Sequence, residues 1–454
     1  MIHSEKKCHI FAADTRLALS NLIVALIAAL FIVEGHAADL SEIFNQAVDN
    51  DPAYLGAGAA NRAAQEGTPQ ARAALLPNAS FEASATTNEQ DVRQASTGAL
   101  GTTGFESTNL LLSITQPIYR KNLFIQLDQA KDQVRQADVT YASARQDLMV
   151  RVAQRYFDVL SAKDELEFAR ASKEAIYQQL QQSRQRFEVG LIAITDVEEA
   201  QAGYDLAVAA EIAAVNQVDN ARESLREVIG RYEENLAPLG KEIPLVVPDP
   251  DDIEAWTQTA LEKNLSLQVA NMAVDVAFAE IERIRAGHLP TVDLVGAHDR
   301  TDAGSRLGTN DTRTTSLSLQ LNVPIYQGGL IMSQTRQARH LHRQAVDELE
   351  RERRSAQRQT RNAFLGVRSG ISSVKALIQA EVSTQSALDA IEAGFEVGTR
   401  TSVDVLDAQS ALFRARRDLA AARYAYILDI LRLKQAAGTL SETDIEQISG
   451  WLNP

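Results

Sequence analysis

The sequence is poor in the residues on which several common protein classes depend. Its 454 residues include one cysteine, 11 prolines and only 6% aromatic residues. One cysteine excludes an internal disulfide framework. The 60 acidic against 45 basic residues, a net charge of −15, argue against nucleic acid as a partner. The scarcity of aromatic side chains argues against one large core and favours helices that touch mainly through alanine.

Long apolar runs are also missing beyond the N-terminus. Three basic residues precede an apolar run from Leu17 to Val33, and small residues at positions 35–37 follow it. This order is typical of a signal peptide, so residues 1–37 are expected to direct export and to be removed. Cys8 precedes the run and is not the lipid-modified first residue of a lipoprotein. No later stretch reaches the roughly 20 apolar residues of a spanning helix, so any entry into a membrane is expected through strands.

Two long stretches contain no proline, one between Pro117 and Pro238 and one between Pro324 and Pro454. Because proline breaks helix interiors, these stretches can hold the longest helices, and Gly190 and Gly398 divide them. We therefore predict two long helices, each followed by a shorter one, over residues 121–187, 195–230, 327–395 and 402–438.

The two proline-free stretches belong to a duplication. The tetrapeptide Phe-Glu-Val-Gly at 187–190 recurs at 395–398, a spacing of 208 residues. Upstream, Gln-Pro-Ile-Tyr at 116–119 recurs as Val-Pro-Ile-Tyr at 323–326. The chain is thus predicted to contain two copies of one structural unit, which cover residues 38–230 and 252–438.

The shorter helix of each copy carries a seam of small apolar residues. Their positions follow alternating steps of three and four residues, broken at Glu211 in the first copy and at Asp429 in the second. This spacing is typical of coiled coils, and alanine at many seam positions lets the helix axes come close. We expect walls of packed helices, to which two earlier helical stretches, 39–72 and 252–288, contribute.

Each copy also contains a segment with the period of a strand. From residue 316 to 325, apolar residues alternate with polar ones, and residues 110–119 alternate less regularly. Each segment follows a weaker partner strand. Together they predict two hairpins, 78–119 and 290–326, with loops rich in Gly, Thr, Asp and Asn at 88–107 and 298–312.

The four strands admit two interpretations. Their apolar face fits lipid, but about eight strands are the minimum for a membrane barrel, and an open sheet edge in lipid leaves backbone groups unpaired. Several protomers would then share one barrel. In the other interpretation, the strands form a small soluble layer packed on the helices.

Four further motifs give the sequence a specific resemblance. They are Leu-Pro-Thr at 289–291, Pro-Ile-Tyr-Gln-Gly-Gly at 324–329, Glu-Ala-Gly-Phe-Glu-Val-Gly-Thr-Arg-Thr at 392–401 and Val-Asp-Val-Leu-Asp-Ala at 403–408. With the duplicated order of elements, they make the mature chain closely resemble the TolC family of outer-membrane efflux proteins.

The resemblance implies a mainly α fold with a membrane β-barrel. The protein would be a homotrimer whose twelve-stranded barrel in the outer-membrane lipid continues into a twelve-helix tube in the periplasm. A mixed equatorial layer would come from residues 231–251 and 439–454.

The resemblance also implies a function and partners. The protein would be a passive exit duct of the cell outer membrane for tripartite efflux, type I secretion or both. Its periplasmic helix tips would close it, and docking of a periplasmic adaptor and an inner-membrane pump of the RND or ABC type would open it. With no nucleophile, phosphate loop or metal set in the sequence, we expect neither an enzyme nor a cofactor or metal. The alternative, a periplasmic coiled-coil adaptor or scaffold without a pore, leaves the strands unexplained.

Asp404 and Asp407 are the candidate cation-binding residues. They lie three positions apart on one helical face, and threefold symmetry would gather six carboxylates around the axis. Like charges so placed resist joint ionisation and attract cations, and the resemblance assigns both residues to the constriction of the closed duct. The residues by themselves favour helix capping, because Thr401 and Asp404 have the spacing of a capping box.

The resemblance also implies a latch between neighbouring helix turns. Arg400 matches the family's latch arginine, and Thr195 and Asp196 stand in the acceptor positions. Gln179 and Glu392 match a second linking pair. Exposed ion pairs are worth about 0–1 kcal/mol, which suits a gate that a partner must open.

Two details of the sequence bear on this latch. Phe395 stands where a close relative has tyrosine, so one hydroxyl link is missing. This departure predicts a weaker closed state unless another contact replaces the link. The tetrapeptide Thr-Asp-Val-Glu at 195–198 also has the spacing of a capping box, a role that is compatible with the latch.

Overall fold

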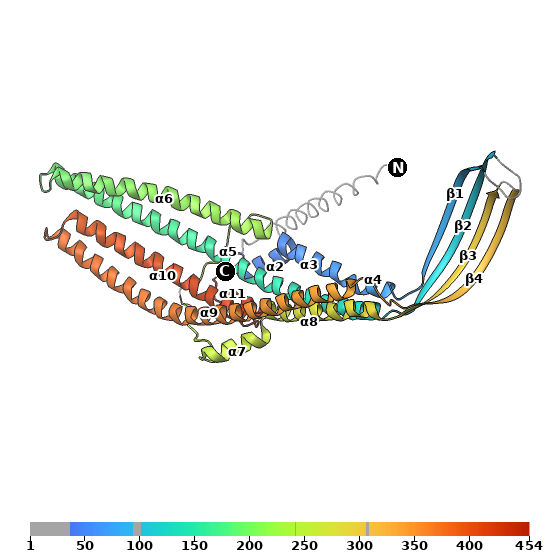
Figure 1. Ribbon diagram of the computed structural model, residues 1–454. Helices are drawn as coiled ribbons and strands as arrows, with labels where there is room; N and C mark the ends of the chain where they lie inside the picture. Colours follow the sequence, from blue (N-terminus) through green and yellow to red (C-terminus); the bar gives the residue numbers. More distant parts are fainter. Residues whose placement is uncertain (1–36, 94–100, 241, 306–307, 454) are drawn as a thin grey trace, which may run out of the picture.

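The computed structural model describes residues 37–93, 101–240, 242–305 and 308–453. The expected signal peptide lies, except for its last residue, outside the described residues. Long helices form an extended bundle, with a curved β-sheet at one end and the turns of two helical hairpins at the other (Figure 1). The two ends are therefore the places where a membrane and a gate are to be sought.

Both copies of the duplication have the same order of elements. The first contains α2 (Leu40–Asn50), α3 (Pro52–Gln65), α4 (Gly67–Ala73), β1 (Asn78–Val92), β2 (Gly101–Tyr119), α5 (Lys121–Glu188) and α6 (Ile194–Ile229). The second contains α7 (Ile253–Lys263), α8 (Leu265–Arg285), the 3₁₀ turn η1 (Ala286–His288), β3 (Thr291–Ser305), β4 (Gly308–Asn322), α9 (Leu330–Glu396) and α10 (Ser402–Ala436). The short helix α11 (Glu442–Ser449) follows.

The two long helices end where glycine permits a turn. Helix α5 has 68 residues and α9 has 67, so each spans about 100 Å at 1.5 Å per residue. Gly190 and Gly398, just beyond their ends, have φ of +76° and +79°, a left-handed conformation that glycine adopts without a steric cost. The glycines that divide the sequence therefore reverse the chain at the tips.

One shorter helical stretch was expected before each hairpin, over residues 39–72 and 252–288. The structure corrects this expectation, because both stretches are interrupted. Asp51 accepts a hydrogen bond from Tyr54 N at 2.7 Å and caps α3, which begins with Pro52. Asn264 accepts from Leu267 N at 2.9 Å and caps α8. Both of these breaks are new N-caps, since a proline just after the cap or an asparagine at the cap favours a helix start over a continuous helix. A third break, at Glu66 between α3 and α4, has no side-chain cap.

The strands form one antiparallel sheet in the order β1-β2-β3-β4. The pairing of β2 with β3 joins the two copies of the duplication. The prediction of loops at 88–107 and 298–312 is wrong for most of these residues, because they belong to strands. The ladders continue from Asn88↔Phe105 to Val92↔Gly101 and from Thr301↔Thr312 to Ser305↔Gly308. Polar residues on both faces hid these strand ends from a search for apolar alternation.

Strand β4 ends earlier than predicted. Its last residue is Asn322, whereas the alternating pattern extends to Ile325. Pro324 has no N–H to donate to a ladder, and Ile325 is 95% exposed outside the sheet. Gly328 and Gly329, with φ of +59° and +80°, then redirect the chain into α9, which begins three residues later than expected.

The two faces of the sheet differ in polarity. Register places Phe81, Leu112, Ile114 and Leu317 on one face, because residues directly opposite each other share a side. The exposed fractions of these four side chains range from 45% to 76%. On the other face, Asn109 donates to Asp299 at 3.1 Å. One face of the sheet is thus apolar and uncovered in the protomer, and the other is polar.

The main core lies at mid-length. Tyr156 of α5 and Tyr426 of α10 are among its largest fully buried side chains. The Tyr156 hydroxyl donates to Ala237 O at 2.7 Å, and the Tyr426 hydroxyl accepts from Val246 N at 2.7 Å. Both buried hydroxyls are therefore satisfied by the backbone of the segment between the two copies, which holds it against the bundle.

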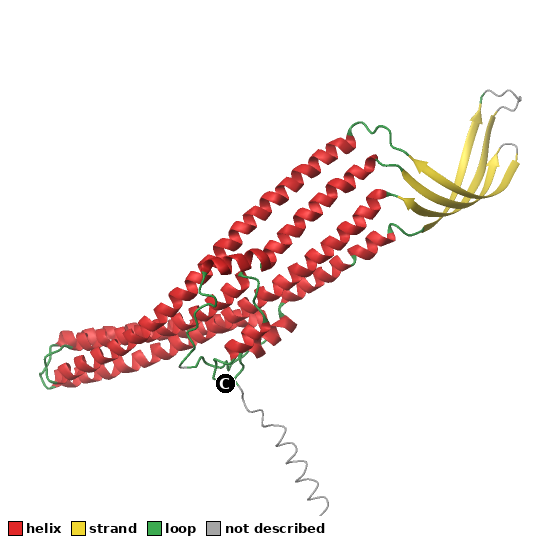
Figure 2. Cartoon of the chain, turned by 90° about the horizontal axis from the view of Figure 1, so that it is seen from below, coloured by secondary structure: helices red, strands yellow, loops and turns green. Residues whose placement is uncertain are grey.

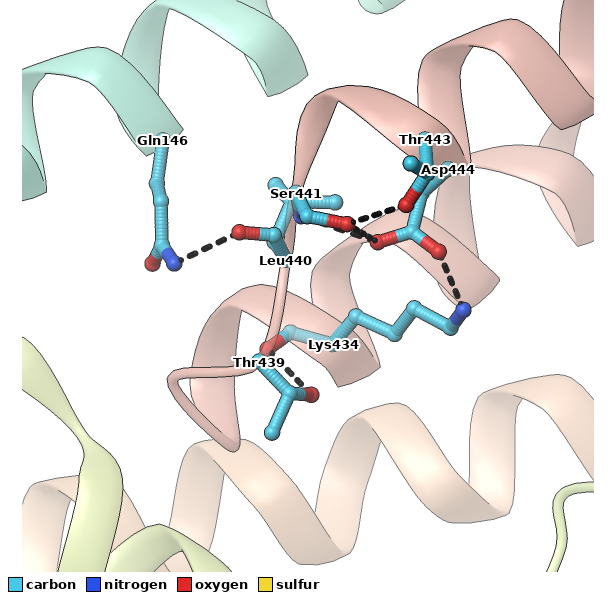
Figure 3. A network of polar contacts seen from close by, with 7 residues as sticks. All are labelled: Gln146, Lys434, Thr439, Leu440, Ser441, Thr443 and Asp444. Atoms are coloured by element: carbon cyan, nitrogen blue, oxygen red, sulfur yellow. Dashed lines mark hydrogen bonds and ion pairs between the residues drawn. The ribbon is translucent and has the colours of Figure 1, made fainter.

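The C-terminal segment is attached at the same level (Figure 3). Gln146 of α5 donates to Leu440 O at 2.9 Å. Ser441 and Asp444 form a capping box at the start of α11, and Asp444 also pairs with Lys434 of α10. The C-terminus of the described chain is thus held at the middle of the molecule, away from the sheet and from the tips (Figures 1 and 2).

Candidate functional site at the helix tips

Two helical hairpins form the end of the molecule opposite the sheet. We call α5 with α6 the first coil and α9 with α10 the second coil. Figure 1 shows them as two separate arms towards their turns. Every residue predicted for the gate or the latch lies in or near these two turns.

The two coils have separate apolar cores near their tips. Leu180, Val197 and Ala200 form one cluster within the first coil. Leu388, Ala408 and Leu412 form another within the second coil. The large core at mid-length contains none of these residues. Since each coil buries its own seam, the tips can move relative to each other without exposing either cluster.

A buried polar junction joins the two coils. Gln179 Nε2 of α5 donates to Ser402 Oγ at 2.9 Å, and Ser183 Oγ lies 3.3 Å from the same hydroxyl. These three residues are at most 5% exposed. Sequence reasoning selected Gln179 but missed Ser183 and Ser402. The four-residue step from Gln179 to Ser183, on one face of α5, was the available signal.

A second contact between the coils was also missed. The guanidinium carbon of Arg186 lies 4.1 Å from the centroid of the Phe395 ring. Its Nη1 donates to the Phe395 backbone carbonyl at 3.3 Å. Phe395 is 6% exposed, so this cation–π contact is formed against a buried ring.

The two turns differ in how their second helices are capped. At α10, the Thr401 hydroxyl caps Asp404 N and the Asp404 carboxylate accepts from Thr401 N at 2.8 Å, a complete capping box as the residues indicated. At α6, the capping box predicted for Thr195 is wrong. The N-cap is Ala193, 208 residues before Thr401, and its side chain has no hydroxyl with which to cap the helix.

The surroundings of the two candidate aspartates also differ. Asp404 is occupied by its cap, and the hydrogen bonds from the Thr401 backbone and side chain, helped by the nearby Arg400, lower the pKa of its carboxyl. Asp407 is exposed on the next turn of α10 and, among the described residues, makes no hydrogen bond or ion pair. Asp407 is thus the more available of the two for a cation.

The latch residues lie at the tip without their expected partners inside one protomer. Arg400 packs its aliphatic stem on α9, since a Cβ added to Gly394 would lie 2.8 Å from Arg400 Cγ. Asp196 is half-buried and Glu392 is exposed. Within the part of the protomer that the structure describes, no ion pair joins Arg400 to Asp196 and no hydrogen bond joins Gln179 to Glu392.

The ends of the molecule define its class. Among the described residues, no helix combines the length and apolarity needed to cross a membrane, whereas one face of the sheet is apolar and exposed. A sheet of this kind, carried by a long helical bundle that ends in two separate coils, is typical of an outer-membrane channel. The chain belongs to the outer membrane efflux protein family, whose model matches residues 43–231 and 256–439, one match for each copy.

Full-length relatives agree with this assignment. The outer membrane protein TolC of Vibrio cholerae is 39% identical over 420 residues, which cover 92% of this chain and 94% of the relative. TolC of Escherichia coli is 37% identical over 448 residues, 96% of this chain and 89% of the relative. The alkaline protease secretion protein AprF of Pseudomonas aeruginosa is 31% identical over 421 residues, 92% of this chain and 88% of the relative.

Solved structures show the same fold at low identity. The CmeC outer membrane channel of Campylobacter jejuni has a TM-score of 0.78 at 15% identity, and the alignment covers 92% of this chain and 90% of CmeC. VceC of Vibrio cholerae has a TM-score of 0.74 at 18% identity, with 88% and 96% covered. The family match and the TolC relatives show that the protein is a channel of the outer membrane, so the alternative of a scaffold without a pore is set aside.

Proposed function

We propose that three copies of the chain form a duct that is closed at rest by the six coils of its tips. Strands β1 and β4 are the edges of the sheet, and an edge in lipid must be paired. Pairing β1 of one protomer with β4 of the next closes a barrel, and three protomers supply twelve strands. The apolar face then meets lipid and the polar face lines the lumen.

The observation that carries the gate is the separation of the two apolar clusters at the tips. Between the coils, buried polar contacts through Ser402 and the Arg186–Phe395 contact hold the arms together. Polar contacts of this kind contribute about 1 kcal/mol each, far less than burial of a shared apolar seam would. A docked partner protein can supply that amount and shift the tips from closed to open.

The latch between neighbouring protomers completes the closed state. Asp196 and Arg400 lack an ion-pair partner among the described residues of their own protomer, and Thr195 and Glu392 are exposed beside them. Threefold assembly brings the first coil of one protomer next to the second coil of its neighbour. There, Arg400 pairs with Asp196 and Thr195, and Asp407 and Asp404 narrow the lumen with negative charge.

The partners follow from the same arrangement. A periplasmic adaptor binds the exposed tips, and an inner-membrane pump of the RND or ABC type delivers the cargo. Relatives are named for metal resistance, as in the cobalt-zinc-cadmium resistance protein CzcC, and for protease secretion, as in AprF. Both kinds of cargo suit a passive duct that carries no chemistry of its own.

Single-channel conductance of the purified protein in planar bilayers tests this proposal. The wild type is expected to give small, cation-selective steps, and Asp196→Ala plus Arg400→Ser is expected to give larger ones. Glu199→Ala plus Arg184→Ser is the matched control, because it removes the same charges within the first coil alone. Absence of any conductance would reject the duct, and equal conductance in both double variants would reject the latch.

A further inference from the structure

We propose that Arg186 is a gate residue that tethers the two coils of each protomer, an inference that rests on the proposed function. The tether has two parts, the cation–π contact with the Phe395 ring at 4.1 Å and the hydrogen bond to the Phe395 carbonyl at 3.3 Å. Arg186 is in the last turn of α5, and Phe395 is in the last turn of α9. The contact therefore lies at the very end of both arms, where their relative movement is greatest.

The end of α9 is a favourable place for a cation from another helix. The last carbonyls of a helix have no intrahelical partner and carry the negative end of the helix dipole. Helix α9 has no basic residue in its own last turn. Arg186 supplies that missing positive charge from α5, so separation of the arms removes it from the α9 terminus.

The burial of the partners gives the tether its strength. Phe395 is 6% exposed and Arg186 is half-buried, so water competes less for the guanidinium than it does at an open surface. A planar guanidinium can lie flat on a ring and still donate from its edge, which an ammonium cannot do. The two parts of the contact thus need arginine.

The tether forms without the missing tyrosine hydroxyl, because it uses the ring and the backbone carbonyl of Phe395. A tyrosine hydroxyl is missing there, and the ring itself is the binding surface in this chain. The contact lies within one protomer, whereas the Arg400 latch is proposed between protomers. The closed state is then held inside each protomer by the tether and by the Gln179–Ser402 junction, and between protomers by the proposed latch.

Conductance of variants in planar bilayers tests the tether. Arg186→Gln removes both parts of the contact and is expected to raise the fraction of open time about fivefold, the effect expected for loss of a partly buried cation–π pair. Arg184→Gln is the matched control, because Arg184 donates to Gln201 inside the first coil at 2.7 Å. It is expected to behave as the wild type.

Phe395 provides the second arm of the test. Phe395→Leu removes the ring but keeps the backbone carbonyl, so it is expected to open the channel less than Arg186→Gln does. The double variant is expected to open no further than Arg186→Gln alone, because that change already removes both parts of the contact. Phe395→Tyr keeps the ring and is expected to stay closed, and Arg186→Lys is expected to lie in between. Equal open time in Arg186→Gln and Arg184→Gln, or additive effects of Arg186→Gln and Phe395→Leu, would overturn the tether.

The failure of the tether and the failure of the duct have different signatures. A wild type that forms no channel rejects the proposed function and the tether with it. A wild type that forms small channels, together with an Arg186→Gln variant that forms the same ones, rejects the tether alone. Heat-resistant trimers on a denaturing gel show for each variant that assembly is intact, so a lost signal is not mistaken for a closed gate.

Discussion

The side-chain amide of Gln179 on α5 lies 2.9 Å from the hydroxyl of Ser402 on α10, and both residues are at most 5% exposed. This buried hydrogen bond joins the first residue of α10 to a residue of α5 that lies about two and a half turns before the end of that helix. Since the apolar clusters on either side of it are separate, the bond is part of what opposes their separation.

Ser402→Ala is expected to loosen the closed state. It leaves the buried Gln179 amide without an acceptor, at a cost of about 1–3 kcal/mol, and opening exposes that amide to water. Single-channel recordings should show longer open times. Ser386→Ala is the control, because Ser386 is exposed and donates only to Val382 O of its own helix, at 3.0 Å. Open times that match this control would show that the junction does not resist opening.

Asp407→Asn is expected to weaken block of the channel by trivalent cations about tenfold, because three exposed carboxylates disappear from one constriction. The helix should be unaffected, since Asp407 has no part in the cap of α10. Asp404→Asn should weaken both block and the start of α10, because it removes the second half of the capping box. The block is measured as the fall in channel current with increasing concentration of the trivalent cation, and circular dichroism checks the helix content of each variant. Unchanged block in Asp407→Asn would place the cation site elsewhere.

The long helices and the hairpins could be predicted because their signals are local. Proline exclusion and a glycine after the last turn place the last residues of α5 and α9 to within about one residue of the structure. The break at Asn264 was not predicted, because a single asparagine is a weak local signal for a helix start and a tertiary contact accompanies it. A Cβ on Gly438 would lie 2.1 Å from Lys263 O, so the chain after α10 packs directly against this break.

The contacts of the candidate site were less predictable than its position. The motifs around 190 and 398 indicate where the tips are, but side chains far apart in sequence form the junctions. Gln179 and Ser402 are 223 residues apart, and Arg186 and Phe395 are 209 apart. Only the packing of one coil on the other brings such pairs together, and no local pattern selects Ser402 over the other serines of the chain.

Tyr424→Phe is expected to destabilise the contact between α5 and α10 at mid-length. The Tyr424 hydroxyl donates to Asp164 Oδ2 at 2.6 Å, and hydrogen bonds to charged groups are worth about 1.5–3 kcal/mol. Thermal unfolding in detergent at pH 7 should show a lower Tm than the wild type. Tyr177→Phe, at an exposed tyrosine of α5, should leave the Tm unchanged, and equal Tm values for the two variants would contradict the prediction.

Asp164→Asn is expected to have a pH-dependent effect on the same contact. Burial raises the pKa of the Asp164 carboxyl, and the Tyr424 hydrogen bond only partly opposes it. A raised pKa means that the folded state binds the proton more tightly than the unfolded state. The contribution of the carboxyl to stability is therefore full below its unfolded value of about 3.9 and is lost as pH rises through the folded value. The Tm difference between wild type and Asp164→Asn should favour the variant more at pH 7 than at pH 4, and a constant difference would contradict this.

Ala193→Thr is expected to convert Asp196 from a latch residue into a capping residue. Ala193 and Thr401 are equivalent N-caps of α6 and α10, and only Thr401 has the hydroxyl of a capping box. A threonine at 193 would cap α6 with a gain of about 1 kcal/mol and would draw the Asp196 carboxylate to the backbone N–H of the cap. The Asp196 carboxylate is then no longer available to pair with Arg400 of the neighbouring protomer. Helix stability should therefore rise while the closed state weakens.

The matched control is Ala193→Val, which adds the same bulk without a hydroxyl. Larger conductance steps with threonine than with valine would link the free carboxylate of Asp196 to closure. Equal steps would mean that Asp196 takes no part in the latch. A stabilising change that opens a gate is otherwise unexpected, because most substitutions that open a closed state also destabilise the fold. The opposite signs of the two effects therefore separate the latch from a general loosening of the tip.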